Sequence, residues 1–535
     1  MNTKTEQTQN QINSNTNTNT NTYLTEGAKY LIKKNMKGIL EIVLEDINNF
    51  KQPLNLKIKS LSVLNNLIKA CGSSLENYVD KILNSIYNKF EDDEEFNKQL
   101  ENVANMLGLT IDQSVIIPIL LKHIQEIESK NSFQPLLSRL KILSYILQKV
   151  TNITNENVTL ILKTLKVLDL FNMPENIFSK NILISLYLIY DSIILNLQIE
   201  CRNFRKEFLL PLLLLQSLPE TKQIHEAVNK TILKLAENNG FTSIEDLYSL
   251  ELEDILSHFN ETHVNWNKSS PDRFAFDTYI KNGGAALEKH WYEILVIISQ
   301  TTEPVKDLEM KMDMICLLDS LIDNEEVNYQ LKSFMDYIIP EILLPSCAWK
   351  SQRPSYKVRK AALVCLIKIF KGNLCEKETS IGLFTEFFNV LKQALDDDWD
   401  PEIRFLAINL LREYFIFNGQ EFSEENLREY YPVLLKRLDD SQDANRIAVC
   451  IIISIFFKCC KRVKMSDTVL DYVLNTSFIH LDDPNEKVRE AIFGFLKDSI
   501  GVCKDILIKI ANRNLNIFTH KSMIDRLLEI ANNSA

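Results

Sequence analysis

The sequence predicts an all-α protein in which antiparallel helix pairs stack side by side. Apolar residues make up 45% of the 535 residues, which is enough to build an extensive interior. Glycine and proline, with 12 and 14 occurrences, are too scarce to supply the frequent turns of a sheet-rich protein. Apolar residues recur every three or four positions over stretches of about 14–20 residues, which is the period of an amphipathic helix.

Composition and pattern divide the chain into three parts. Residues 1–22 are rich in Asn and Thr and contain almost no apolar side chains, so we expect a disordered tail. Residues 23–265 carry helical stripes without a sharp motif, and we expect degenerate helical repeats there. Residues 266–535 carry a clear motif and form regular repeats that can be continuous with the preceding array. The segment 263–291 holds the only Gly-Gly pair and is expected to be a long loop between repeats or a bend.

A motif of acidic residues followed by an arginine recurs in the C-terminal half. It reads LDDDWDPEIR from residue 395, LDDSQDANR from residue 438 and LDDPNEKVR from residue 481. We align its copies on Asp397, Asp439 and Asp482, which lie 42 and 43 residues apart. The arginines that follow are Arg404, Arg446 and Arg489, and an equivalent Arg359 stands 45 residues before the first of them. A period of about 40–47 residues with two helices per period is typical of HEAT repeats, and of an armadillo-like α-solenoid in general.

The motif has the chemistry of a turn between the two helices of one repeat. An aspartate before a helix accepts hydrogen bonds from unpaired backbone N–H groups, and we expect Asp400, Asp440 and Asp483 to cap their helices in this way. The arginine lies in the first helical turn, where the dipole disfavours a cation, so we expect it to pair with an aspartate in the same or an adjacent turn, with the aligned aspartates Asp397, Asp439 and Asp482 as its partners. Stacked repeats would then form a ladder of such pairs along one edge. Partly exposed pairs of this kind contribute about 0–1 kcal/mol each and would set register more than stability. The motif is therefore predicted to be a structural joint.

Common motifs for cofactor binding and catalysis do not occur in the sequence. Neither glycine-rich phosphate loop, GxxxxGK[ST] or GxGxxG, is present, and there is no HExxH or GxSxG. His258 and His263 are five residues apart, a spacing that does not place them on one helical face for a metal ion. We therefore predict a protein that is not an enzyme and that has no cofactor and no metal site.

Charge and cysteine usage limit the partners and the compartment. The formal net charge of −11 supplies no basic surface of the kind that nucleic acids require. The ten cysteines lie mostly inside apolar helical patterns, as buried reduced thiols do in a reducing compartment. The N-terminus lacks the apolar core of a secretion signal, and the longest apolar runs, 208–215 and 448–457, are shorter than the ~20 residues that span a bilayer. We expect a cytosolic or nuclear protein that binds neither nucleic acid nor membrane.

Two surface segments are candidates for contacts with partner proteins. The turn AWKSQRPSYKVRK, residues 348–360, places a tryptophan among cations, a combination that is frequent in interface hot spots. The candidate contact residues in this turn are Trp349, Lys350, Arg353 and Lys357. The acidic stretch FEDDEEF, residues 90–96, is expected to be a solvated loop, with docking of a basic partner as the alternative.

Three segments resemble the HEAT-repeat dynein axonemal assembly factors, number five in that series, most clearly over residues 270–535. They are PEILLPSCAWKSQRPSYKVRKAALVCLIKIF from residue 340, VLLKRLDDSQDANRIAVCIIISIFF from residue 433 and SFIHLDDPNEKVREAIFGFLKDSI from residue 477. The resemblance implies a non-enzymatic cytoplasmic scaffold for the preassembly of axonemal dynein arms. Its implied partners are dynein intermediate chains and chaperones or co-chaperones.

Two other functions are compatible with an acidic helical solenoid. An importin-like transport receptor would bind a GTP-loaded small GTPase through its first repeats. A tubulin-binding HEAT array would use Trp349 and the neighbouring cations on an exposed turn edge.

Overall fold

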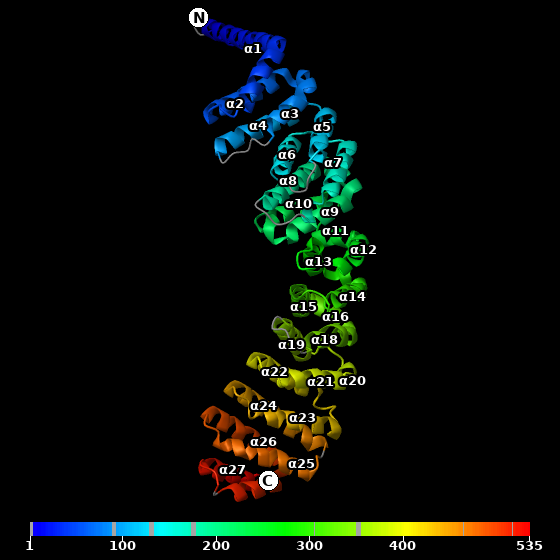
Figure 1. Cartoon of the computed structure of the whole chain (residues 1–535), viewed down its shortest axis with the longest axis vertical. Helices are drawn as coiled ribbons and strands as arrows, with labels where there is room; N and C mark the ends of the chain where they lie inside the picture. The colour runs from blue at the N-terminus through cyan, green and yellow to red at the C-terminus, as the bar shows by residue number, and fades with distance from the viewer. Residues whose placement is uncertain are drawn as a thin grey trace. The chain divides into compact units, whose positions relative to one another are not determined.

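The computed structural model is built from helices, and Figure 1 shows them stacked in pairs. It describes residues 4–87, 93–127, 133–172, 178–303, 305–348, 355–463, 465–515 and 517–534, with side chains from residue 26 onward except at residues 172 and 461–463. These ranges contain no β-strand, which confirms the predicted all-α class. The first helix, α1 (Lys4–Asn48), begins inside the Asn/Thr-rich segment, and the disorder of residues 1–22 stays a prediction.

The chain forms two compact units. Unit 1 comprises Met1–Ile255 and Ser270–Tyr279, and unit 2 comprises Leu256–Ser269 and Ile280–Ala535. The boundary that we predict between residues 265 and 266 falls inside the stretch where the chain passes between the units. Whether one continuous array joins them stays a prediction.

Unit 1 consists of two layers of helices. One layer contains the second helices of the repeats, and each of them packs on the next. They are α2 (Leu54–Cys71), α4 (Glu94–Thr110), α6 (Phe133–Leu147), α8 (Ser179–Leu197) and α10 (His225–Asn238). The other layer contains the first helices, α3 (Val79–Ile86), α5 (Gln113–Gln125), α7 (Asn155–Leu168) and α9 (Arg205–Ser217). The short α11 (Ile244–Leu250) follows, and α12 (Leu252–Thr262) and α13 (Pro271–Asn282) lie where the chain passes between units.

Unit 2 repeats this arrangement. Its second helices pack in the order α15 (Leu308–Asp323), α19 (Ser355–Lys371), α22 (Pro401–Asn418), α24 (Asp443–Val463) and α26 (Glu486–Asn514). Its first helices are α14 (Trp291–Thr301), α16 (Glu325–Leu331), α17 (Met335–Tyr337), α18 (Leu344–Cys347), α20 (Lys377–Gly382), α21 (Phe384–Leu395), α23 (Glu424–Arg437) and α25 (Asp467–Phe478). A last helix, α27 (Lys521–Asn533), packs on α26.

Short helices of other types fill many connections. The 3₁₀ helices are η1 (Gly72–Tyr78), η2 (Leu170–Asn172), η3 (Gln198–Phe204), η4 (Pro219–Ile224), η5 (His263–Asn265), η6 (Gly284–His290), η7 (Lys332–Phe334) and η9 (Ile479–Asp482), and η8 (Ile338–Leu343) is a π-helix. The prediction of a long loop over residues 263–291 is wrong, because η5, α13 and η6 occupy most of this segment. Its Gly-Gly pair serves the turn into η6, where Gly284 adopts a φ of +51°, a left-handed conformation that favours glycine.

The cores of both units come from the predicted apolar stripes. In α2, Leu61, Leu64 and Leu67 are buried between neighbouring helices. In unit 2, aromatic rings join successive helices, because Phe387 of α21 stacks on Tyr414 of α22 with 4.2 Å between ring centroids. Contacts of this kind add to the burial of apolar area, which drives the stacking of the repeats.

One apolar stretch is longer than the runs at residues 208–215 and 448–457. Ser179–Ser217, which covers α8, η3 and α9, is long and apolar enough to cross a membrane by length and composition alone. However, 56% of its most apolar window is buried inside the protein, and α8 packs against both α6 and α10. The burial of a helix between two neighbours accounts for its apolar character.

Gly108 lies at a close crossing between α4 and α6. A Cβ atom at this position would lie 2.3 Å from the backbone oxygen of Ile146 in α6. Backbone atoms of a packed helix cannot move aside as a flexible side chain can, so the crossing requires a residue without a Cβ.

We expect Gly108→Ala to lower the free energy of unfolding by about 1–3 kcal/mol, because the added methyl group forces α4 and α6 apart. Chemical denaturation followed by circular dichroism measures the change. Gly38→Ala in α1 is the matched control, since no atom lies within 4 Å of its added Cβ. That control should raise stability by about 0.5–1 kcal/mol through helix propensity, and equal losses in both variants would contradict the close crossing.

Candidate functional site

A ladder of arginine–aspartate pairs links consecutive repeats of unit 2. Arg404 of α22 binds Asp440 in the turn of the next repeat, with Nε 2.7 Å from Oδ2 and Nη2 3.1 Å from Oδ1. One repeat earlier, Arg359 of α19 binds Asp397, and the two side chains are only 3% and 2% exposed. Arginine and carboxylate groups thus meet in the interior at these joints.

The third pair continues the ladder with more exposure to solvent. Arg446 of α24 lies 3.2 Å from Asp483, measured from Nε to Oδ2, with side-chain exposures of 15% and 8%. For Arg404 and Asp440 the values are 10% and 1%. The arginines Arg404, Arg446 and Arg489 are each the fourth residue of their helix, so the ladder repeats one helical register.

Each arginine also holds the turn of its own repeat. Nη1 of Arg404 donates to the backbone oxygen of Asp397 at 2.7 Å. The equivalent bonds run from Arg446 to Asp440 at 3.0 Å and from Arg489 to Asp483 at 2.7 Å. The guanidinium groups of Arg404 and Arg446 therefore each bridge two successive turns, whereas Arg489 bonds within its own turn.

The aspartates of these pairs also bond to the backbone of their own turns. Oδ1 of Asp397 accepts the N–H of Trp399 at 3.0 Å. Oδ1 of Asp440 accepts the N–H of Gln442 at 3.0 Å, two residues further along. An aspartate that bonds the N–H two residues on closes an Asx-turn, so the carboxylate that receives the arginine also defines the loop.

The predicted pairing residues were wrong by one position in two copies. Asp440 and Asp483, rather than Asp439 and Asp482, bind the arginines of the preceding repeats. The pairing aspartate stands seven positions before the arginine in the first copy and six positions before it in the other two. Aligning all three copies on the spacing of the first therefore selected the neighbouring aspartate in the second and third copies.

The displaced aspartates have separate roles. Asp439 is 77% exposed at the surface. Asp482 accepts the backbone N–H groups of Thr519 and His520, both at 3.1 Å from Oδ1, immediately before α27 begins. It therefore anchors the last helix.

The capping predictions were right at one position and wrong at two. Asp400 caps α22 by accepting the N–H of Glu402 at 2.9 Å. Asp440 and Asp483 are not caps, because α24 and α26 begin three residues after them. Asn485 caps α26 instead, accepting the N–H of Lys487.

The charged pairs of the ladder are more buried than we expected from the sequence, and burial makes each charge depend more strongly on its partner. Burial alone raises the pKa of Asp440, but hydrogen bonds from Arg404, the Gln442 N–H and Asn445 outweigh it and lower the pKa below its ordinary value. Hydrogen bonding to Asp440 raises the pKa of Arg404. Removing one member of such a pair leaves an uncompensated buried charge, which costs far more than a surface pair contributes.

Arg437 adds further bonds between the repeats that contain α21 and α23. We did not predict this role from the sequence. From the end of α23 it donates to the backbone oxygen of Leu395 at 2.7 Å and to Asp396 at 3.0 Å, both in the preceding repeat. Its place directly before the LDD string of the second copy was the available signal.

The two predicted contact segments are only partly described. Trp349, Lys350 and Arg353 lie outside the described residues, whereas Lys357 is exposed on the first turn of α19. In the acidic stretch, Asp93 caps α4 by accepting the N–H of Phe96 at 2.8 Å. Both segments remain predictions as partner contacts.

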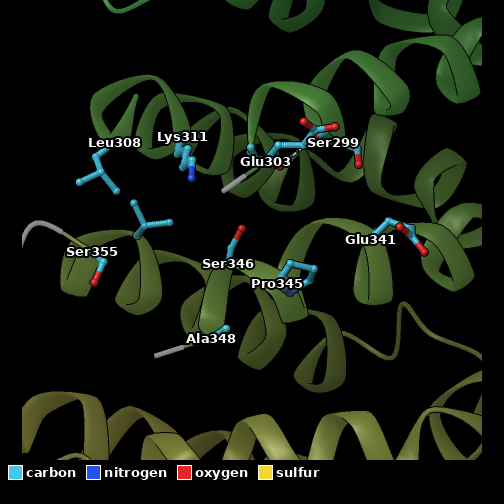
Figure 2. Close-up of a pocket in the computed structure, with 11 residues that line it drawn as sticks. Ser299, Glu303, Leu308, Lys311, Glu341, Pro345, Ser346, Ala348 and Ser355 are labelled. Carbon is cyan, nitrogen blue, oxygen red and sulfur yellow. Dashed lines mark hydrogen bonds between the residues drawn. The ribbon is translucent and has the colours of Figure 1, made fainter. Parts of the chain in front are cut away.

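A cavity of about 210 Å³ lies in unit 2 beside the turn that carries Lys357. Helices α14 and α15 form one wall, and η8, α18 and α19 form the other (Figure 2). Pro340 and Pro345 lack the N–H groups that an α-helix needs, and Leu344 donates to Ile339, five residues back. This wider π-turn forms part of the cavity wall that contains Glu341, Pro345 and Ser346.

The cysteines of the chain are mostly buried, and their surroundings affect the pKa of the thiols. Nine of the ten cysteines are buried, as the apolar patterns predict, and Cys316 is the exposed one. Burial raises the pKa of Cys347 and of Cys503 to about 12, which keeps these thiols protonated. Within the described residues, no group of three or more His, Cys, Asp or Glu side chains is placed to hold a metal ion.

We expect Arg404→Met to lower the free energy of unfolding of unit 2 by up to about 3–5 kcal/mol, because it removes the two hydrogen bonds of Arg404 to the buried Asp440 carboxylate and leaves Arg437, at 3.5 Å, as the remaining cation. The matched control is Arg428→Met, which removes a largely exposed pair with Glu424 in α23. That change should cost less than about 0.5 kcal/mol. Urea denaturation compares the two, and similar losses would refute a special role for the buried pair.

The ladder also predicts acid sensitivity. Asp440 has a lower pKa in the folded chain than in the unfolded chain, so its contribution is complete above the unfolded value of about 3.9 and is lost as pH falls through the folded value. Thermal unfolding of the wild type should therefore lose more stability below pH ~4 than that of the double variant Arg404→Met/Asp440→Leu. Parallel pH profiles of the two proteins would contradict this assignment.

Comparison with known proteins finds sequence similarity to the dynein axonemal assembly factor 5 proteins. A family model described as the HEAT-repeat domain of dynein axonemal assembly factor 5 matches residues 18–219. That match lies in the half where we found the resemblance less specific than over residues 270–535. Dynein axonemal assembly factor 5 of Xenopus laevis is 21% identical over 90% of this chain and 57% of its own length. The human protein of the same name is 20% identical over 90% of this chain and 56% of its own length.

Solved structures with helical repeats are also similar to the chain. Importin beta has a TM-score of 0.37 at 12% identity, covering 92% of this chain and 61% of its own. The karyopherin Kap121p bound to Nup53p has a TM-score of 0.34 at 12% identity, covering 94% and 62%. The chain spans a little over half the length of the curated relatives that it matches. The chain is thus a helical-repeat α-solenoid whose sequence is similar to that of dynein axonemal assembly factor 5.

Proposed function

We propose that the protein is a non-enzymatic scaffold for the preassembly of axonemal dynein arms in the cytoplasm. The observation that carries this proposal is the match of residues 18–219 to the HEAT-repeat domain of dynein axonemal assembly factor 5. Similarity to the curated relatives over 90% of the chain supports it. The proposed partners are dynein intermediate chains together with chaperones or co-chaperones.

The stacked repeats suit this role because their surface grows with each added helix pair. A solenoid offers an extended face on which one partner can contact several repeats, without a closed pocket. The buried ladder in unit 2 fixes the register of successive repeats, so contact points on neighbouring helices keep a constant spacing. Several weak contacts at fixed spacing then act together as one strong attachment.

The proposed role needs no chemical reaction. A scaffold holds immature subunits next to each other and next to a chaperone, which raises their effective concentration. The buried cysteines and the charged pairs at the joints act in this view as packing and register elements.

We expect the tagged full chain, expressed in cells that build motile cilia, to co-purify axonemal dynein chains and chaperones from the cytoplasmic fraction. Mass spectrometry of the recovered proteins measures this. The control is an unrelated helical-repeat protein of similar length and net charge, which should recover neither class. Absence of both dynein chains and chaperones under gentle conditions would contradict the proposal.

The same extracts test one of the two alternatives, and the purified chain tests the other. Recovery of a GTP-loaded small GTPase in place of dynein chains would favour the transport-receptor alternative. Co-sedimentation of the purified chain with microtubules would favour the tubulin-binding alternative.

A further inference from the structure

The outer face of α1 carries apolar side chains that unit 1 leaves exposed. Figure 1 shows α1 at the N-terminal end of unit 1, where it packs on α2 and α3. The buried side chains of α1, among them Leu40, Val43 and Leu44, lie on one side of the helix. Leu31 and Ile42 lie on the other side and are 60% and 65% exposed. Because the terminal repeat of a solenoid needs a polar outer face to stay soluble, an apolar one points to a partner that covers it.

The exposed apolar residues form one stripe with a glycine in its middle. At 3.6 residues per turn, Leu31, Gly38 and Ile42 lie within about 40° of one another around the helix axis. No atom lies within 4 Å of a Cβ built on Gly38. A second helix can therefore approach the backbone of α1 closely at this point.

Charged side chains beside this stripe differ in sign on the two sides of Gly38. Lys34 precedes the glycine, and Glu41 and Glu45 follow it; all three are exposed. Helical geometry places all three on the same side of the stripe. None of them forms a side-chain hydrogen bond or an ion pair with the rest of the chain that the structure describes. Their charges are therefore available to a partner.

This order of charges is self-complementary in an antiparallel pair of α1 helices. When the two-fold axis passes through Gly38, Lys34 of one copy lies between Glu41 and Glu45 of the second copy. The symmetry repeats this contact, so two such sets form at one interface. A parallel pair would instead bring Lys34 beside Lys34 and Glu41 beside Glu41, where like charges repel.

The same arrangement covers the apolar residues. Leu31 of one copy lies within about one helical turn of Ile42 of the second copy, so both leave water together. Phe50, which is 85% exposed just after α1 ends, lies as far from the axis as residue 26 does on the other side. It therefore faces the beginning of the described side chains of the second helix.

We propose that two copies of the chain dimerise through the outer face of α1, packed antiparallel about a two-fold axis at Gly38. Burial of Leu31 and Ile42 drives the association, and the pairs between Lys34 and the two glutamates set its direction. The inference goes beyond the proposed scaffold function, because it concerns how copies of the chain associate and not what they hold.

Disulfide cross-linking of the purified full chain tests the position of the axis. Gly38→Cys is made together with Cys316→Ser, which removes the exposed native thiol. Mild oxidation with copper phenanthroline should give a covalent dimer, because Cα atoms that face each other at the axis lie within the ~7 Å that a disulfide spans.

Gly27→Cys in the same Cys316→Ser background is the matched control. Gly27 is also exposed on the outer face of α1, and no atom lies within 4 Å of its added Cβ. In the antiparallel pair its two copies lie about 33 Å apart along the helices, so this variant should not cross-link. A covalent dimer of Gly27→Cys, or none of Gly38→Cys, would overturn the arrangement.

Charge reversal followed by sedimentation equilibrium tests the contacts themselves. Lys34→Glu should raise the dissociation constant of the dimer about 10- to 30-fold, because it gathers three carboxylates at each of two symmetric sites. The triple variant Lys34→Glu/Glu41→Lys/Glu45→Lys inverts every pair and should restore the dissociation constant to within a few-fold. A triple variant as weak as Lys34→Glu would refute the pairing.

Leu31→Asp tests the apolar contact and should leave the chain monomeric in the same measurement. Val167→Asp is the matched control, since Val167 is a 79% exposed apolar residue in α7, and it should dimerise as the wild type does. A wild type that stays monomeric at high micromolar concentration would overturn the proposal and would leave residues 1–22 or a different protein to cover this face.

Discussion

The buried arginine–aspartate pair between successive repeats is the constraint on which the geometry of unit 2 depends. Apolar burial drives the helices together but is non-directional, so by itself it does not fix one stacking register. The guanidinium group of Arg404 reaches a carboxylate of the next turn and a backbone oxygen of its own turn. These bonds form only at one relative position of the two repeats, because hydrogen bonds require both distance and direction. A slipped register would leave charges buried without partners.

Unit 1 links its repeats with polar contacts that differ from joint to joint. Gln113 of α5 donates to the backbone oxygen of Asn152 and accepts from the Thr154 N–H in the next repeat. Arg205 binds Glu251, whose side chain is almost fully buried. Because each joint uses a different residue pair, no common string recurs along the sequence. This variety explains why the motif fades in the N-terminal half while the helical stripes persist.

The helical class and the arginine positions could be predicted from the sequence, because both depend on local spacing. The partners of the arginines could not be assigned with the same certainty, since one added residue in the turn before Arg404 shifts the alignment of neighbouring aspartates. Burial of the pairs was also beyond the sequence, because it depends on how adjacent helices cover the turn.

The exposure of the ladder increases in one direction along unit 2. The pair at Arg359 is almost dry, the pair at Arg404 is slightly wetter, and the pair at Arg446 is the most accessible to water. Water competes for hydrogen bonds most effectively where it has access, so we expect the charged pairs to weaken in the order Arg446, Arg404, Arg359. Along unit 2, polar bonding thus specifies the stacking register most firmly at the joint of Arg359 and least firmly at that of Arg446.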